Sequence, residues 1–202
     1  ADFNLVGTTL TITLDDDNEA ITFVPTSATG NYTFTLTGAN ISNNFVGTDG
    51  SGITGNGTGT LTVGNGSITD ICVTTNASIT SDGFSFLTTS PTAGTPANLT
   101  VDVDGDIFVQ TDVRFVGNGS LDIVDGNQVE VNGNNFNITA PGGRLNIAIP
   151  IDASSGPEFR AETINIAAID ADSNGLTFVG DTSISGVVTR GGAIQVTGNL
   201  AT

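Results

Sequence analysis

The stretch Leu121-Asp-Ile-Val-Asp-Gly-Asn-Gln-Val-Glu-Val131 decides the fold of this chain. Apolar and polar side chains alternate in its two short runs, and Asp125 and Gly126 form a turn signal between them. Alternation with a period of two and many β-branched residues is typical of strands buried on one face. The same texture covers most of the chain, and no window of helical length carries apolar residues at helical spacing. The sequence therefore predicts an all-β protein.

The alternating runs recur at a nearly constant spacing. In steps of 22, 24, 19 and 20 residues, runs begin at Leu99, Leu121, Leu145, Ile164 and Ile184. A second series has the same offset of 22 residues between Ile107 and Val129. Short strands in an imperfect period of about twenty residues, with Gly, Asn and Asp at the corners, are typical of a parallel β-solenoid. The predicted fold is a parallel β-solenoid (β-helix), with an antiparallel β-sandwich or jelly roll as the alternative.

The first part of the chain is less regular than the rest. Residues 1–38 contain longer alternating runs around the acidic turn Asp15–Asp17. Residues 39–59 are rich in Gly and poor in apolar side chains, which predicts a long loop or linker. We therefore predict an N-terminal β segment or cap with a Gly-rich loop at residues 1–56, followed by the β-solenoid at residues 57–202.

Composition excludes several classes of function. The 202 residues include 21 acidic and only 4 basic ones, for a net charge of −17, and there is no His. So few cations argue against binding to nucleic acid or to anionic lipid. The lack of His removes the commonest general base and transition-metal ligand. No apolar run approaches the length of a membrane span, so we predict no membrane insertion. From the scarcity of cations we also predict no binding to nucleic acid.

The chain has the composition of an exported protein. It contains no Lys, and its strong negative charge disfavours non-specific association. We predict an extracellular, secreted protein of the cell surface. The single cysteine, Cys72, cannot form an internal disulfide, and we expect it to pack as a small apolar residue beside Ile71 and Val73. An exposed thiol would favour an intermolecular bridge instead.

Four repeats resemble those of a known family. They are Gly105-Asp-Ile-Phe-Val109, Gly119-Ser-Leu-Asp-Ile-Val124, Gly143-Arg-Leu-Asn-Ile-Ala-Ile149 and Glu162-Thr-Ile-Asn-Ile-Ala167. In texture, residues 57–202 are similar to the repeats of bacterial filamentous-haemagglutinin-like secreted β-solenoid surface proteins. This resemblance implies a β-helical adhesin or fibre. The Asn-Pro-Asn motifs that mark the secretion domain of that family are absent, so the resemblance does not extend to that domain.

Calcium is the one cofactor that the sequence suggests. Residues 170–181 follow the D-x-D-x-N-G spacing of a calcium loop, with oxygen ligands expected at Asp170, Asp172, Asn174 and Asp181. A plain turn between two strands is the alternative for this segment.

A second acidic run has three carboxylates at alternate positions, Asp102, Asp104 and Asp106. Alternation in a strand places them on one face, where like charges repel each other. Either a bound calcium ion or exposure to solvent at a turn would relieve that repulsion.

Together these features predict a non-catalytic structural protein, a subunit of a self-assembling surface filament or appendage, or of an adhesin stalk. The open ladders at the ends of a solenoid need a cap or a partner, and head-to-tail contacts between copies generate open filaments. We expect other copies of the chain, joined end to end, as the main partner. One alternative is a carbohydrate-binding adhesin module, with a surface glycan or host-cell ligand bound by residues 39–59 and 88–97. The other is a β-helical polysaccharide-processing enzyme that uses paired carboxylates, although cations and aromatic platforms are scarce.

Overall fold

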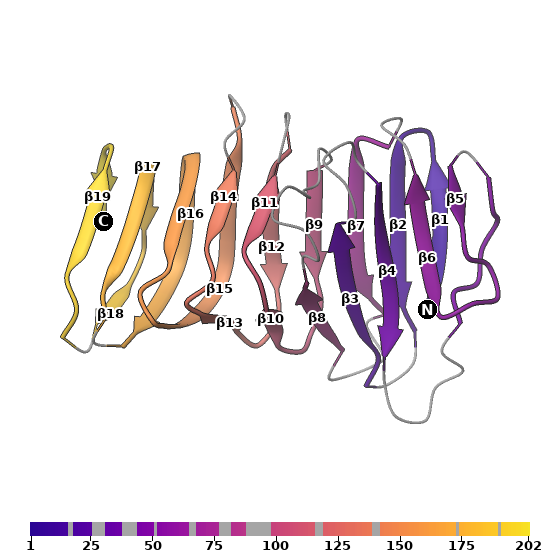
Figure 1. The fold of residues 1–202 in the computed structure, drawn as a ribbon, viewed down its shortest axis with the longest axis horizontal. Coiled ribbons are helices and arrows are strands. Elements are labelled where there is room, and N and C mark those ends of the chain that lie inside the picture. Colours follow the sequence, from indigo (N-terminus) through magenta and orange to yellow (C-terminus); the bar gives the residue numbers. More distant parts are fainter. Residues whose placement is uncertain are drawn as a thin grey trace.

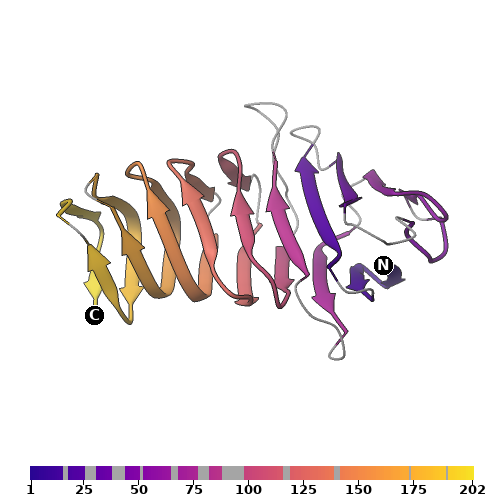
Figure 2. The same cartoon turned by 90° about the horizontal axis from the view of Figure 1, so that it is seen from below.

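The computed structural model describes residues 1–15, 18–25, 31–37, 44–50, 52–64, 68–76, 82–87, 98–115, 119–138, 142–172, 174–189 and 191–202. Within these ranges the chain forms strands, turns and irregular segments but no helix. The strands stack into an elongated shaft, with the N-terminal strands at one end and the C-terminus at the other (Figure 1). Figure 2 shows the same stack from a perpendicular direction. Most pairings between strands are parallel, so the predicted all-β solenoid is confirmed.

The rungs of the solenoid align their strands in three columns. Column A contains β2 (Thr9–Leu14), β7 (Asp70–Thr75), β9 (Asn98–Asp102), β12 (Leu121–Asp125), parts of β15 (Arg144–Ser154), β16 (Glu158–Ala171) and β17 (Leu176–Ile184), and β20 (Leu200–Ala201). Column B contains β3 (Ala20–Pro25), β8 (Gly83–Phe86), β10 (Ile107–Val109), β13 (Val129–Asn132), parts of β15 and β16, and β18 (Val187–Thr189). Column C contains β11 (Val113–Phe115), β14 (Phe136–Ile138), the first parts of β16 and β17, and β19 (Ile194–Thr197).

Parallel stacking in register places like residues on top of each other in a dry interior. In column A the inward positions are at most 1% exposed at Leu10, Ile71, Leu99, Leu121, Leu145 and Ile164. In column C three rings stack, with centroids 5.5 Å apart between Phe136 and Phe159 and 5.3 Å apart between Phe159 and Phe178. Such stacks add to the stabilisation from burial alone.

The rungs shorten toward the C-terminus, which corrects one predicted register. The expected partner of Ile164 in the following rung was Ile184, but Ile164 pairs with Thr182, and Ile184 pairs with Ile166. The step is therefore 18 residues here, and it is 18 again from Thr182 to Leu200. The predicted offset between Ile107 and Val129 is confirmed.

Antiparallel strands cover the N-terminal end of the stack. Strand β1 (Asp2–Val6) pairs with β2 in column A. In column B, β4 (Asn31–Thr37) pairs with β3, β6 (Thr60–Gly64) with β4, and β5 (Ile53–Thr54) with β6. The parallel stack already begins with β2 and β3, before the expected boundary at residue 57, whereas β6 lies beyond that boundary and belongs to the cap. The cap and the shaft therefore interleave along the sequence.

The Gly-rich segment contributes more to the core than its composition predicts. Phe45 and Ile53 are both fully buried, and the ring of Phe45 lies edge-on to that of Phe3 at 6.5 Å. The amino group of Ala1 contacts the carboxylates of Asp15 at 2.6 Å and Glu19 at 2.9 Å, which ties β1 to the turn after β2. In the part of the chain that the structure describes, no helix is long and apolar enough to cross a membrane.

Candidate functional site

The four expected ligands at residues 170–181 lie on different parts of the coil. Asp170 is near the end of β16 in column B, opposite Asp152, while β17 carries Asp181 into column A, opposite Thr163. A calcium loop needs its first and twelfth residues to converge on one ion, and an extended strand separates them here. Asp181 accepts hydrogen bonds from the backbone and side-chain amides of Asn199 at 3.2 and 2.9 Å.

Asp172 and Asn174 form a turn that stabilises itself. The carboxylate of Asp172 accepts bonds from the backbone amides of Asn174 at 2.8 Å and Ser155 at 3.1 Å, and from the side-chain amide of Asn174 at 3.0 Å. The backbone bonds from Asn174 and Ser155 lower the pKa of Asp172, since they favour its charged form. The local bonds thus support the plain-turn alternative for this segment.

Asp102, Asp104 and Asp106 follow the predicted alternation. All three side chains are half-buried on the outside, while Val103 and Gly105 between them are buried. Asp104 links two rungs, since its Oδ1 accepts a hydrogen bond from the backbone N–H of Asp82 in the preceding rung at 2.8 Å. Among the described residues, no three His, Cys, Asp or Glu side chains are grouped so as to hold a metal ion. Calcium binding at either run stays a prediction.

Hydrogen bonds at the corners of the rungs explain much of the Asp and Asn content. Just as Asp104 accepts the amide of Asp82, Asp82 accepts the amide of Glu19 one rung earlier at 2.9 Å. At another corner, Asp112 accepts the amide of Asn135 at 2.8 Å, and Asn135 accepts that of Glu158 at 2.8 Å. Backbone amides at a bend lose their ladder partners, and short acceptor side chains of the adjacent rung replace them.

The polysaccharide-enzyme alternative predicts a groove in which carboxylates and arginines converge. Arg144 and Arg160 lie on the surface, where Arg144 binds Asp122 at 2.7 Å and Arg160 binds Glu158 at 2.9 Å. A shallow cavity of about 160 Å³ is lined by Asp152, Asp170, Ala171 and Asp172, without a basic residue. Arg190 lies outside the described residues.

Cys72 does not occupy the packed position that its neighbours suggest. It lies half-buried in the outward row of column A, between Thr11 and Thr100, while Ile71 and Val73 point inward. Burial and the nearby charge of Asp102 raise the pKa of the thiol, which reduces its reactivity.

The last rung of the described shaft leaves its inward side uncovered. Ile194 is 41% exposed and Leu200 47%, whereas their register partners in the preceding rung, Leu176 and Thr182, are 2% and 3% exposed. Residues 191–202 also carry no charged side chain, in a chain whose net charge is −17. This neutral stretch is the sequence signal that marks the surface, and it matches none of the motifs that predict a site.

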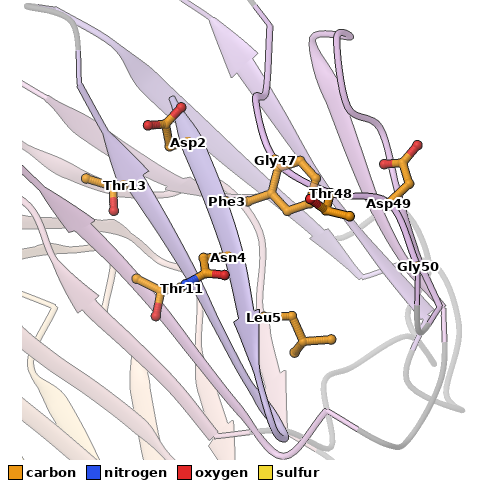
Figure 3. Close-up of a pocket in the computed structure, with 10 residues that line it drawn as sticks. All are labelled: Asp2, Phe3, Asn4, Leu5, Thr11, Thr13, Gly47, Thr48, Asp49 and Gly50. Carbon is orange, nitrogen blue, oxygen red and sulfur yellow. The ribbon is translucent and has the colours of Figure 1, made fainter.

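The opposite end has a groove beside β1 (Figure 3). It encloses about 410 Å³ and is lined by Asp2, Phe3, Asn4, Leu5, Thr11, Thr13 and Gly47–Gly50. One wall is the outer surface of β1 and β2, and the other is the segment Gly47–Gly50, which runs past the edge of β1. Val6, the last residue of β1, is 69% exposed, and Val46 beside β1 is 58% exposed. The expected ligand-binding segment 39–59 therefore contributes part of this groove, whereas residues 88–97 lie outside the described residues.

No protein-family model, curated protein or solved structure matches this chain. The geometry of the solenoid and of its two ends therefore carries the functional argument.

Proposed function

We propose that this chain is a non-catalytic structural protein of the cell surface, a subunit that joins copies of itself end to end into a filament or adhesin stalk. The observation that carries the proposal is the uncovered C-terminal rung. Among the described residues, β19 and β20 pair only with β17, and Ile194 and Leu200 face solvent at positions that the preceding rung buries. Exposed ladder edges with apolar side chains favour the addition of another chain.

Charge supports growth along the axis. Acidic side chains line the outside of the shaft, for example Glu130, Asp152 and Asp170 at successive outward positions of column B. Side-by-side contact of two shafts would bring such rows together, and like charges repel. Residues 191–202 of the last rung carry no charged side chain, so no such row of carboxylates faces an axial contact there. The acidic, Lys-free surface also supports the proposed extracellular location.

Electron microscopy and sedimentation at increasing concentration test the proposal. We expect the parent chain to form filaments, and Leu200→Glu to abolish them by placing a charge in the axial contact. The matched control is Val124→Glu, because Val124 is also 47% exposed but lies within the shaft. A parent that stays monomeric at every concentration contradicts the proposal, and so does an equal loss of filaments in both variants.

The groove beside β1 favours a second candidate, the carbohydrate-binding module. Asp2, Asn4, Thr11, Thr13 and Thr48 offer hydroxyl, amide and carboxylate groups, which bind sugar hydroxyls. This candidate predicts saturable binding of a soluble oligosaccharide to the monomer, measured by calorimetry, and loss of that binding in Asn4→Ala.

A further inference from the structure

Strand β1 has one edge that is only partly used. In an antiparallel pair, alternate residues bond to the partner, and the residues between them point their N–H and C=O groups the other way. The backbone groups of Phe3 point away from β2, because its N–H donates to the carbonyl of Val46 at 2.8 Å. Leu5, two residues on, therefore points its backbone groups to the same outer edge.

The chain leaves this edge after Val46. The amide of Val46 still donates to the carbonyl of Ala1 at 3.0 Å, but the amide of Gly47 turns away to the side chain of Asn56 at 3.2 Å. Among the residues that the structure describes, none bonds to the backbone of Leu5 on this side. The side chain of Leu5 is only partly buried. The groove in Figure 3 thus borders the edge of β1, where no described residue bonds to the backbone of Leu5, and the side chain of Leu5 is part of its lining.

An open edge of this kind binds an extended segment by adding it as a further strand. The order of the strands in column A indicates which segment could pair with this edge of β1. Among the described strands, β1 is the first member of that column and β20 is the last, so in a head-to-tail stack the open part of β1 and the outer edge of β20 meet on the same side of the shaft. All strands of column A except β1 run parallel to each other, so β20 of the next copy meets β1 antiparallel.

The side chains match this pairing. On β20, Leu200 occupies the inward row and Ala201 the outward row, like their partners Thr182 and Ser183. On β1, Phe3 and Leu5 face inward and Asp2, Asn4 and Val6 outward. Leu200 would therefore cover Leu5, and the small side chain of Ala201 would lie beside the outward side chains of β1. No charged side chain of residues 191–202 opposes the carboxylates of Asp2 and Asp49 at the groove.

We propose that β1 is the acceptor strand for β20 of a second copy, seated in the groove between β1 and Gly47–Gly50. This inference rests on the end-to-end assembly proposed above and identifies its interface. The backbone of Leu5 and of Leu200–Ala201 supplies the hydrogen bonds, and the contact of Leu5 with Leu200 supplies the apolar burial.

Disulfide trapping tests the pairing directly. In a Cys72→Ser background, a cysteine is placed in β1 at Asp2, Asn4 or Val6 in turn and combined with Ala201→Cys. Oxidation of at least one pair is expected to give a ladder of covalent oligomers on a denaturing gel. The matched control replaces Ala201→Cys by Ser183→Cys, which is its exposed register partner one rung inside the shaft and should give no ladder.

A second pair of variants isolates the backbone donor. Leu5→Pro and Leu5→Ala both remove the leucine side chain, but only proline also removes the outward N–H, and an edge strand tolerates proline at such a position. We expect the critical concentration for assembly to be about tenfold higher for Leu5→Pro than for Leu5→Ala. Circular dichroism confirms that both variants are folded.

The outcomes separate this interface from the assembly itself. A ladder with Ala201→Cys and none with Ser183→Cys supports the pairing. Filaments of the parent without any ladder, or equal critical concentrations for the two Leu5 variants, overturn the β1–β20 interface and leave end-to-end assembly in place. A parent that forms no filaments at any concentration, including when it binds an oligosaccharide as a monomer, overturns both proposals.

Discussion

Alkaline pH should destabilise the N-terminal cap through a single side chain. Tyr32 in β4 is 1% exposed and packs against Phe23, with centroids 5.7 Å apart, and Phe34, with centroids 6.1 Å apart. Burial raises the pKa of Tyr32 from its ordinary value of 10 to about 12. The folded chain therefore keeps the phenol neutral at a pH at which the unfolded chain ionises it.

The sign and size of the effect follow from proton linkage. Below about pH 10 both states hold the proton, so Tyr32 contributes no pH dependence to the stability there. Between about pH 10 and pH 12 only the unfolded state loses it, and the free energy of unfolding falls as pH rises. One pKa unit is worth about 1.4 kcal/mol, so a shift from 10 to about 12 makes the full loss about 3 kcal/mol.

Urea unfolding across this pH range, for the parent and for Tyr32→Phe, measures the difference. Both proteins share Cys72 and the arginines, so subtracting their curves isolates the phenol. The chain has one Tyr and no Trp, so the ultraviolet absorbance of phenolate reports Tyr32 alone. The reasoning is refuted if Tyr32 ionises near pH 10 while the chain is folded, or if both proteins lose the same stability.

Three further predictions concern the shaft. Phe159→Ala removes the middle ring of the column C stack and should lower the free energy of unfolding by about 3–5 kcal/mol, against less than about 1 kcal/mol for exposed Phe108→Ala, both measured in urea. Gly180→Ala should lower the melting temperature far more than Gly186→Ala, because Gly180 has φ +141° and a Cβ there would overlap the carbonyl oxygen of the preceding rung. If the predicted loop binds calcium, millimolar calcium should raise the melting temperature of the parent but not of Asp170→Asn, and an unchanged parent contradicts that prediction.

The sequence specifies the rung but leaves its register open. Alternation determines which side chains point inward, and Leu99, Leu121 and Leu145 stack as their spacing predicts. A shift of two residues keeps the same side chains inward, so the pattern cannot distinguish Thr182 from Ile184 as the partner of Ile164. The structure selects Thr182, a polar residue in an inward position whose hydroxyl donates to the carbonyl of Gly180 at 3.0 Å.

Strand direction is a second feature that alternation does not encode. The runs in β4 and β6 have the same period of two as those of the shaft, yet they pair antiparallel and cap it. The candidate calcium residues show a similar limit. Their spacing is visible in the sequence, but whether Asp170 and Asp181 meet depends on whether the chain turns or extends between them. Here β17 extends.

The two ends of the described shaft differ in a way that gives assembly a direction. Antiparallel pairing at the N-terminal end reverses the strand direction of column A and leaves only a short part of β1 open, whereas the C-terminal rung leaves the outer edges of β19 and β20 unpaired. A long exposed edge usually causes indiscriminate pairing, and charge along a protein limits it. With a net charge of −17, repulsion acts over about 8 Å at physiological salt and opposes side-by-side contact. Residues 191–202, at the end of the described shaft, carry no charged side chain, so repulsion is weaker at that end than along the sides. The same charge distribution therefore keeps shafts apart side by side and favours contact along their common axis.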